Sequence, residues 1–177
     1  RNDTWRERLI AHADDLALGP GDDLLEVGCG TGTITDWLVQ RVAPGHVTAI
    51  DFSREMIDRA AAKGIDATFR CADVVSDDLG ERVYDAALCF HAFPHFRDKP
   101  AAVANLARSL LAGGCLIVMH LNGWRKINAF HDQLGGPIAG DHLPAPDEWS
   151  GLLTPAGFSE PDIIDRDDLL LLTARRR

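Results

Sequence analysis

The sequence predicts an α/β fold in which helices cover both faces of a mostly parallel sheet. Strand-like and helix-like patterns alternate through most of the chain, as they do in parallel α/β sheets. A short apolar strand runs directly into a glycine turn and a helix, as in doubly wound sheets. The 177 residues, 46% of them hydrophobic and 25% charged, have the length and composition of one globular domain. We therefore expect residues 1–177 to form a single domain.

The first part of the chain contains two helices and two strands. Residues 4–18 have apolar side chains at helical spacing, and Gly19-Pro20-Gly21 ends that pattern. Residues 23–27 are predicted as the first strand and residues 33–42 as the first crossover helix. Residues 46–50 then give the second strand, so the order is helix, strand, helix, strand.

The middle of the chain continues the alternation. A helix over residues 53–62 begins at Ser53, a good N-cap residue, and carries Glu55 in its first turn. Residues 67–71 and 84–90 are predicted as the third and fourth strands. Both strands lie between helical segments, which favours parallel pairing.

Further along, a helix, a glycine pair and a strand follow one another. Residues 98–111 are predicted to be helical, Gly113-Gly114 to turn the chain, and residues 115–120 to form an apolar fifth strand. Residues 124–134 again have helical character.

The last part of the chain is less regular. Residues 135–146 are rich in glycine and proline and are predicted as a loop, and residues 147–156 as a helix. Residues 162–165 and 169–174 form two short strands, the second of which is expected to run antiparallel.

Charge, hydropathy and cysteine content indicate which kinds of partner and which compartment to expect. The formal net charge of −9 disfavours a nucleic-acid substrate, because an acidic surface repels phosphates. No apolar run approaches the ~20 residues of a membrane span, so we expect no membrane partner. The four cysteines, without a C-x-x-C pair, suggest reduced thiols in a cytoplasmic protein and no metal centre. The expected oligomeric state is a monomer or homodimer.

The glycine turn from Glu26 to Gly32 is the most informative motif. It has the spacing G-x-G-x-G, with an acid two residues before the first glycine, whereas the dinucleotide fingerprint is G-x-G-x-x-G. A glutamate here is a poor neighbour for a pyrophosphate and a good one for an ammonium group. This turn therefore argues against an NAD-dependent oxidoreductase, which is the main alternative from another enzyme class.

The turn resembles motif I of the class I S-adenosylmethionine (SAM) methyltransferases. Residues 49–53 resemble motif II, residues 84–91 resemble motif IV, and residues 111–118 resemble the helix-turn-strand signature that follows. The chain is similar to small single-domain bacterial enzymes of the methyltransferase type 11 group. This resemblance implies a Rossmann-like, seven-stranded, mostly parallel sheet with one antiparallel strand near the C-terminus. It also implies SAM as cofactor and S-adenosylhomocysteine as product.

The resemblance implies a set of cofactor-binding residues. Glu26 and the glycine turn would hold the methionine moiety, and Asp73 would accept the adenine amino hydrogens. Asp51 lies roughly twenty residues beyond the turn, where a doubly wound fold places a carboxylate beside the ribose. Phe52 or Met56 would pack on the adenine. The predicted cofactor residues are Glu26, Gly28, Cys29, Gly30, Gly32, Asp51, Phe52, Met56, Ala72, Asp73, Val74 and Phe90.

Two histidine-bearing segments are candidates for the methyl-acceptor side. Residues 91–96 and 120–131 each follow a strand at its carboxyl end, where this fold class binds ligands. The candidate catalytic residues are His91, His95, His120, Arg125, Asn128 and His131. Of these, the last three lie three residues apart on one helical face. Residues 122–147, with the first helix, are the segments that could cover an acceptor, and His142 could reach the same mouth.

Three roles for these histidines stay open. One of them could deprotonate or orient the acceptor, they could bind a metal or a metallated tetrapyrrole substrate, or they could simply form a polar wall. Pro94 disfavours a continuous metal-binding helix through His91 and His95. The predicted function is SAM-dependent methyl transfer to a small molecule, whose acceptor atom is undetermined. The alternative is a SAM-binding protein without methyl transfer, either a sensor or a pericyclase-like catalyst.

Overall fold

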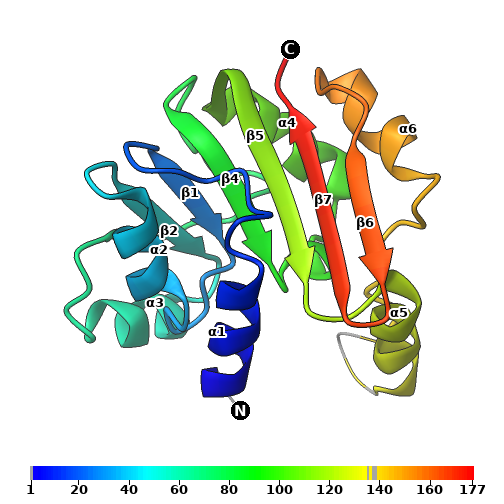
Figure 1. Cartoon of the computed structure of the whole chain (residues 1–177), viewed down its shortest axis with the longest axis horizontal. Helices are drawn as coiled ribbons and strands as arrows, with labels where there is room; N and C mark the ends of the chain where they lie inside the picture. Colours follow the sequence, from blue (N-terminus) through cyan, green and yellow to red (C-terminus); the bar gives the residue numbers. More distant parts are fainter. Residues whose placement is uncertain (1, 135, 137–138) are drawn as a thin grey trace.

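The computed structural model describes residues 2–134, 136 and 139–177, and within them a seven-stranded sheet of order β3-β2-β1-β4-β5-β7-β6. The first five strands pair in parallel, and β7 runs antiparallel to both of its neighbours (Figure 1). The strands are β1 Leu24–Val27, β2 Val47–Asp51, β3 Thr68–Cys71, β4 Tyr84–Phe90, β5 Leu110–His120, β6 Asp162–Arg166 and β7 Leu169–Arg175. The predicted fold class, with its one reversed strand near the C-terminus, is confirmed.

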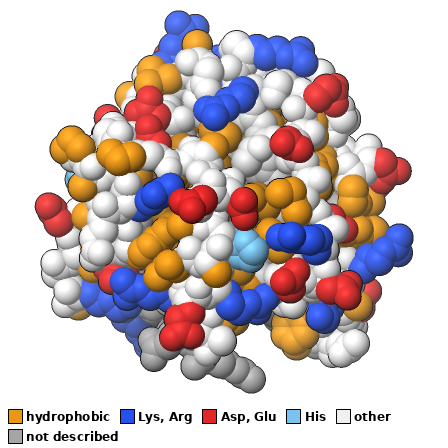
Figure 2. All heavy atoms as spheres, viewed as in Figure 1, with side chains coloured by type: hydrophobic (Ala, Val, Ile, Leu, Met, Phe, Trp, Pro, Cys, Tyr) orange, Lys and Arg blue, Asp and Glu red, His pale blue; other side chains and the backbone are white. Residues whose placement is uncertain are grey.

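Six α-helices and two short 3₁₀ turns are found among the described residues. They are α1 Asn2–Ala11, α2 Thr35–Val42, α3 Arg54–Ala61, η1 Phe93–His95, α4 Lys99–Ser109, α5 Trp124–Gln133, α6 Trp149–Leu153 and η2 Thr154–Ala156. None of these helices has the length and apolarity needed to cross a membrane. On the face of the molecule shown in Figure 2, acidic and basic side chains are intermixed with hydrophobic ones.

The helices cover the two faces of the sheet as separate layers, and each layer has its own hydrophobic core. On one face, Leu24 of β1 packs in a cluster with Leu9 of α1 and Leu38 of α2. On the other face, Leu25 packs in a cluster with Leu106 of α4. The central strands are buried on both sides, which is why they appear in the sequence as continuous apolar runs.

Two helix starts follow directly from local sequence. The hydroxyl of Ser53 accepts the backbone N–H of Met56 at 3.4 Å and caps α3, as predicted. The carboxylate of Asp98 accepts the N–H of Ala101 at 2.9 Å and caps α4 in the same way. These caps fix where the two helices leave the sheet edge.

The predicted helix over residues 4–18 is too long. The helix α1 ends at Ala11, and residues 12–18 continue as turns from which Leu16 and Leu18 are buried in the core. Asp14 and Asp15 would have placed two negative charges near the helix C-terminus, where the helix dipole opposes them. The apolar spacing therefore reflected burial rather than a continuous helix.

The predicted turn at Gly113-Gly114 is wrong, because this glycine pair lies inside a strand. The strand β5 begins at Leu110, directly after α4, and its pairing with β4 shifts register between Tyr84 and Ala86. Gly113 has φ +80°, and a Cβ on Gly114 would lie 2.9 Å from the carbonyl oxygen of Leu111. The glycines therefore allow a kinked strand, not a helix-to-strand reversal.

The predictions for the C-terminal part are largely correct. The helix predicted over 147–156 is divided into α6 and η2, with Pro155 inside the 3₁₀ turn. The hairpin of β6 and β7 forms as expected. Within the predicted loop 135–146, residues 135, 137 and 138 lie outside the described residues.

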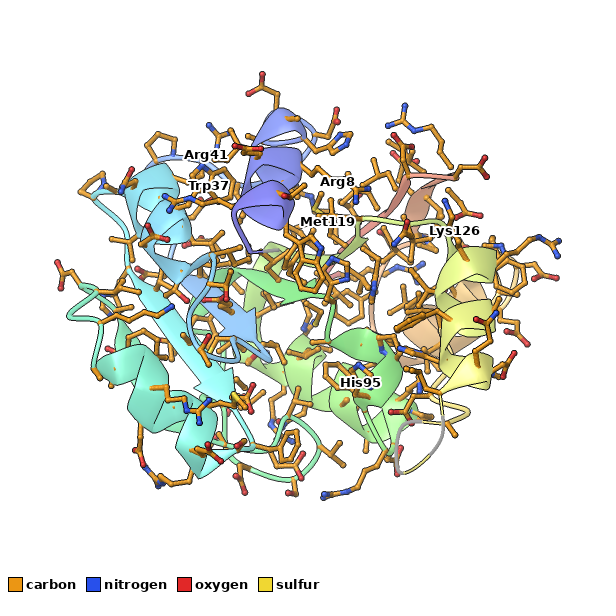
Figure 3. All side chains as sticks on the ribbon, turned by 90° about the horizontal axis from the view of Figure 1, so that it is seen from below. Arg8, Trp37, Arg41, His95, Met119 and Lys126 are labelled. Atoms are coloured by element: carbon orange, nitrogen blue, oxygen red, sulfur yellow. The ribbon has the colours of Figure 1, made fainter. Side chains whose placement is uncertain are left out.

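The carboxyl ends of the parallel strands meet at one edge of the sheet. Helices α1 and α5 both lie at this edge, below the strand ends in Figure 1. Figure 3 looks onto the edge, with Arg8 on one side of it and His95 on the other. Ligands in open α/β sheets bind at this edge.

Candidate active site

A cleft of about 580 Å³ opens at the carboxyl ends of the strands. Its first side is formed by Val27, Gly28, Ile50, Asp51, Phe52, Ala72, Asp73 and Val74. Its second side is formed by Val75, His91, Ala92, His95, Phe96, Arg97 and Asp141. The first side contains five of the predicted cofactor residues besides Gly28, and the second contains two of the predicted acceptor histidines.

The glycine turn adopts a conformation that side chains would obstruct. Gly28, Gly30 and Gly32 have φ values of +72°, +55° and +70°, which L residues rarely adopt. A Cβ on Gly28 would lie 2.6 Å from the Cβ of Ala92. The N–H of Gly28 donates to Ile50 O at 2.8 Å, which ties the turn to β2. Gly28 lines the cleft, whereas Cys29, Gly30 and Gly32 shape the turn behind it.

Asp51 is a buried carboxylate held in a fixed position on the cleft wall. It is 9% exposed and accepts the N–H of Gly30 and the N–H of Ser53, each at 2.9 Å. Each carboxylate oxygen keeps a further lone pair for a ligand hydroxyl. This geometry fits a carboxylate that accepts two ribose hydroxyls.

Asp73 is also on the wall and has two protein partners. One oxygen accepts the N–H of Val75 at 2.8 Å, and the other forms an ion pair with Arg97 at 2.6 Å. The neighbouring Ala72 and Val74 are buried and offer a small apolar surface for a flat ring. Phe52 is 78% exposed at the rim of the cleft.

Two predicted adenine-side or sulfonium-side contacts, Met56 and Phe90, are not among the residues that line the cleft. The ring of Phe90 packs against the hydrophobic cluster on the α1–α3 face of the sheet. The apolar side chains on the first side of the cleft are therefore those of Val27, Ile50, Phe52, Ala72 and Val74.

Glu26 lies behind the glycine turn rather than on the cleft wall. It is 2% exposed and accepts the hydroxyl of Thr35 at 2.7 Å. Burial, together with the nearby Asp36 and Asp51, raises the pKa of this carboxyl to about 8, although the Thr35 hydrogen bond acts in the opposite direction. At neutral pH Glu26 is therefore mostly a neutral acid until a cation approaches it.

His91 stands at the junction between the glycine turn and the second side of the cleft. It directly follows β4, has φ +56°, and stacks on the indole of Trp5 with ring centroids 5.1 Å apart. Its ring also meets His120 edge-to-face at 5.0 Å. Burial, with Arg8 and His95 nearby, lowers the pKa of His91 to about 4, so the imidazole is neutral at physiological pH.

His95 and His131 are joined through Asp141. Nδ1 of His95 lies 2.7 Å from a carboxylate oxygen of Asp141, and Nδ1 of His131 contacts the backbone carbonyl of the same residue. The two imidazole centroids are 5.1 Å apart. The loop residue Asp141 is thereby held on the cleft by two of the predicted histidines.

The structure does not bring Arg125 or Asn128 to the cleft. Arg125 is exposed and lies over the Trp124 ring at 4.7 Å, while Asn128 makes two hydrogen bonds with the backbone of Leu143. His142 lies 2.7 Å from Asp132 and points away from the cleft. Two residues of the predicted helical face, Asn128 and His131, instead contact the backbone of the following loop. This face therefore positions the loop and does not line the cleft.

Three residues at this site, Trp5, Arg97 and Asp141, were not predicted from sequence. Arg97 directly follows the histidine-bearing segment 91–96, so its position in the sequence could have indicated it. Asp141 is next to His142, the loop residue that the sequence suggested could reach the same mouth. Trp5 carries no local signal, because its contact with His91 joins residues far apart in the chain.

The described residues contain no group of three or more His, Cys, Asp and Glu side chains arranged to hold a metal ion. The histidines instead contact aromatic rings, Asp141 and one another.

Comparison with known proteins identifies the family. The family described as "Methyltransferase domain" matches residues 24–114, which span the glycine turn, Asp51, Asp73 and His91. Over 88% of its length the chain is 27% identical to a demethylmenaquinone methyltransferase of Thermus thermophilus, covering 81% of that relative. It is 31% identical to phosphoethanolamine N-methyltransferase 1 of Triticum aestivum over 92% of this chain, but covers only 33% of that protein.

The fold comparison agrees with the family. The structure superposes on a SAM-dependent methyltransferase from Mesorhizobium loti with a TM-score of 0.77 at 21% identity, covering 99% of this chain and 100% of that one. The two relatives are named for different acceptors, so their names do not determine the acceptor of this protein. The chain belongs to the methyltransferase domain family and is a class I SAM-dependent methyltransferase.

Proposed function

We propose that the protein transfers the methyl group of SAM to a small-molecule acceptor bound at the second side of the cleft. The contact between Gly28 and Ala92 carries this proposal, since a Cβ on Gly28 would lie 2.6 Å from that of Ala92. The turn expected to hold the donor and the wall that bears His91 are therefore in direct contact. A cleft of about 580 Å³ also falls within the ordinary range for small-molecule sites.

The residues of the first side fit SAM. The bare backbone of the glycine turn accommodates the methionine moiety, and Asp51 accepts the ribose hydroxyls. Ala72 and Val74 border the adenine, and Asp73 accepts its amino hydrogens in exchange for the contact with Arg97. When bound, SAM supplies an electrophilic methyl group at a sulfonium. The neutral Glu26 behind the turn ionises as the cationic amino group of SAM approaches.

The second side positions the acceptor. His91, Ala92 and His95 line the cleft next to one another, Asp141 lines it beside His95, and Trp5 of α1 stacks on His91. Methyl transfer depends mainly on alignment of the acceptor atom with the methyl group, so rigid walls contribute directly to the rate. Of the other candidates, His131 contacts the backbone carbonyl of Asp141 and His120 packs edge-to-face against His91, so both contact residues of this side. Arg125 and Asn128 remain candidates only for an indirect role, through the position of the loop.

A single assay tests the proposed function. The protein is incubated with SAM and either the small-molecule or the macromolecular fraction of a cell extract, and S-adenosylhomocysteine is measured. We expect product with the small-molecule fraction, and its loss in the variant Asp51→Ala. Product with only the macromolecular fraction would contradict the proposal. SAM binding without product in either fraction would favour the sensor or pericyclase-like alternative. A cytoplasmic location and a monomeric or homodimeric state remain predictions.

A further inference from the structure

Three aromatic rings form a row at the carboxyl ends of β4 and β5. The indole of Trp5 stacks on the imidazole of His91 with centroids 5.1 Å apart and planes 29° apart. The imidazole of His120 contacts the imidazole of His91 edge-to-face, with ring centroids 5.0 Å apart and planes 82° apart. These rings belong to three different elements, α1, the end of β4 and the end of β5, so tertiary packing brings them together.

The two imidazoles of this row have unused hydrogen-bonding capacity. Nε2 of His91 and Nε2 of His120 are both buried, and neither has a hydrogen-bond partner among the residues that the structure describes. His120 is 2% exposed. A buried polar atom without a partner costs about 1–3 kcal/mol, and two such atoms on neighbouring rings are rarely retained without a use.

A hydroxyl group is the ligand that best satisfies this pair. A hydroxyl donates one hydrogen bond and accepts another, while two neutral imidazoles offer one ring nitrogen as acceptor and one N–H as donor. A protonated amine bonds both rings only when both Nε2 atoms are bare acceptors, and a carboxylate only when both carry hydrogen, whereas a hydroxyl bonds both rings when one or both of them carry hydrogen.

The charges around the row also favour an uncharged ligand. The lining carboxylates other than Asp51 already have side-chain partners, Asp141 on the second side with His95 and Asp73 on the first side with Arg97. Burial and the Arg8 guanidinium hold the pKa of His91 low, and burial lowers that of His120. On the second side of the cleft, a cationic acceptor would therefore find no unpartnered carboxylate among the described residues.

We propose that the pair His91 and His120 binds the hydroxyl of a flat, uncharged acceptor such as a phenol, and that Trp5 covers the ring of this acceptor. This inference rests on the proposed function. The indole is 42% exposed, so it can turn outward and cover a flat ring whose hydroxyl lies in the plane of the His91 imidazole. His91 is then the catalytic base, His120 the second residue that bonds the hydroxyl, and Trp5 a determinant of specificity.

The reaction balances as an O-methylation. The acceptor oxygen attacks the methyl carbon of SAM, and the electron pair of the breaking C–S bond stays on sulfur to give S-adenosylhomocysteine. The acceptor O–H bond breaks with its electrons left on oxygen, and the proton passes to Nε2 of His91 and then to solvent.

Four compounds built on the same fused two-ring framework test the acceptor class. These probes are 2-naphthol, decahydro-2-naphthol, 2-naphthylmethylamine and 2-naphthoate, assayed by S-adenosylhomocysteine formation and by calorimetric binding to protein loaded with S-adenosylhomocysteine. We expect kcat/KM for 2-naphthol to exceed that for each other probe by at least tenfold. A preference for the amine or the acid, or neither binding nor methylation of 2-naphthol, overturns the inference.

Variants test the three rings separately. His91→Asn, which tolerates the positive φ, is expected to lower kcat at least ~100-fold with unchanged SAM affinity. His120→Gln is expected to raise KM for 2-naphthol more than it lowers kcat, and Trp5→Leu to remove the preference for the flat over the saturated ring. His142→Gln is the matched control, because this histidine pairs with Asp132 outside the cleft. Equal rates for the His91→Asn and His142→Gln proteins overturn the role of His91.

Different results would contradict the hydroxyl inference and the proposed function. Methylation of small molecules at amine or carboxylate groups would refute only the hydroxyl inference. Methylation of macromolecules alone would refute the proposed function as well.

Discussion

At the scale of single residues, the glycine turn illustrates how two constraints can act on one position. Gly28 and Gly30 both have positive φ values, but only Gly28 also faces a neighbouring side chain. A Cβ on Gly30 would meet no atom within 4 Å. An alanine at Gly30 would therefore meet backbone strain alone, whereas an alanine at Gly28 would meet both backbone strain and steric overlap.

Gly28→Ala is expected to lower the free energy of unfolding by about 1–3 kcal/mol more than Gly30→Ala, because only the first substitution overpacks against Ala92. Denaturant unfolding without cofactor measures both. Equal losses would show that the strained φ accounts for the whole cost and that Ala92 yields freely.

Asp51→Ala is expected to weaken SAM binding at least tenfold, about 1.4 kcal/mol, through loss of the carboxylate between the turn and the ribose. Isothermal titration calorimetry measures the affinity. Asp66→Ala, an exposed carboxylate that precedes β3, is the control and should bind SAM normally. Unchanged affinity in the Asp51→Ala protein would remove the ribose assignment.

At the scale of elements, α5 and the following loop act as one unit. Asn128 donates to Leu143 O at 3.0 Å and accepts the N–H of Leu143 at 2.9 Å, while His131 contacts the carbonyl of Asp141. Through this unit the side chain of Asp141 reaches His95, which lies on the same side of the cleft. The helix thus positions a loop that has little regular structure of its own.

Asn128→Ala is expected to speed hydrogen exchange at the Leu143 amide about tenfold, since two hydrogen bonds of about 0.5–1.5 kcal/mol each are lost. Exchange followed by mass spectrometry or NMR measures the effect. Arg125→Ala, on the same helix and without a contact to the loop, should leave the exchange rate unchanged. Equal protection in both variants would indicate that other contacts hold the loop.

Element boundaries were predictable where burial and local chemistry agree. The apolar run at 84–90 matches β4 residue for residue, and Ser53 marked the start of α3 because its cap is a local hydrogen bond. The strand at Leu110 was missed because its pairing with Tyr84 comes from another part of the chain. Asp51 followed from its spacing in the fold, whereas Asp141 and Trp5 depend on packing between distant segments that local patterns do not encode.

At the scale of the whole molecule, the free energy of unfolding depends on pH through Glu26, the buried acid behind the glycine turn. The pKa of Glu26 rises from 4.5 to about 8 on folding. Between pH 4.5 and about 8 the folded state therefore binds more protons than the unfolded state. The free energy of unfolding falls as the pH rises through this range. The pKa shifts of His91 and His120 are downward and act only below about pH 6.5, where stability falls as pH falls.

Between pH 6.5 and 8, the wild-type protein without cofactor is expected to lose stability by up to about 1.4 kcal/mol per pH unit, and Glu26→Gln to remove this slope. Denaturant unfolding across the pH range measures it. Glu55→Gln, at an exposed position on α3, should keep the wild-type slope. A slope that persists in the Glu26→Gln protein would mean that another group titrates on folding.

The anchoring of α1 also constrains how the chain is made. Arg8 donates to the carbonyls of Leu121 and Asp168, the second bond at 2.9 Å and 160 residues away in sequence. During translation at roughly 5–20 residues per second, α1 therefore waits some ten to thirty seconds before its last docking partner leaves the ribosome. Leu9, fully buried in the finished fold, packs with Leu24 and Leu38, which follow it closely in the sequence, so these contacts can form well before Arg8 reaches Asp168. The docking of α1 is therefore completed only after the residues between β6 and β7 have been made.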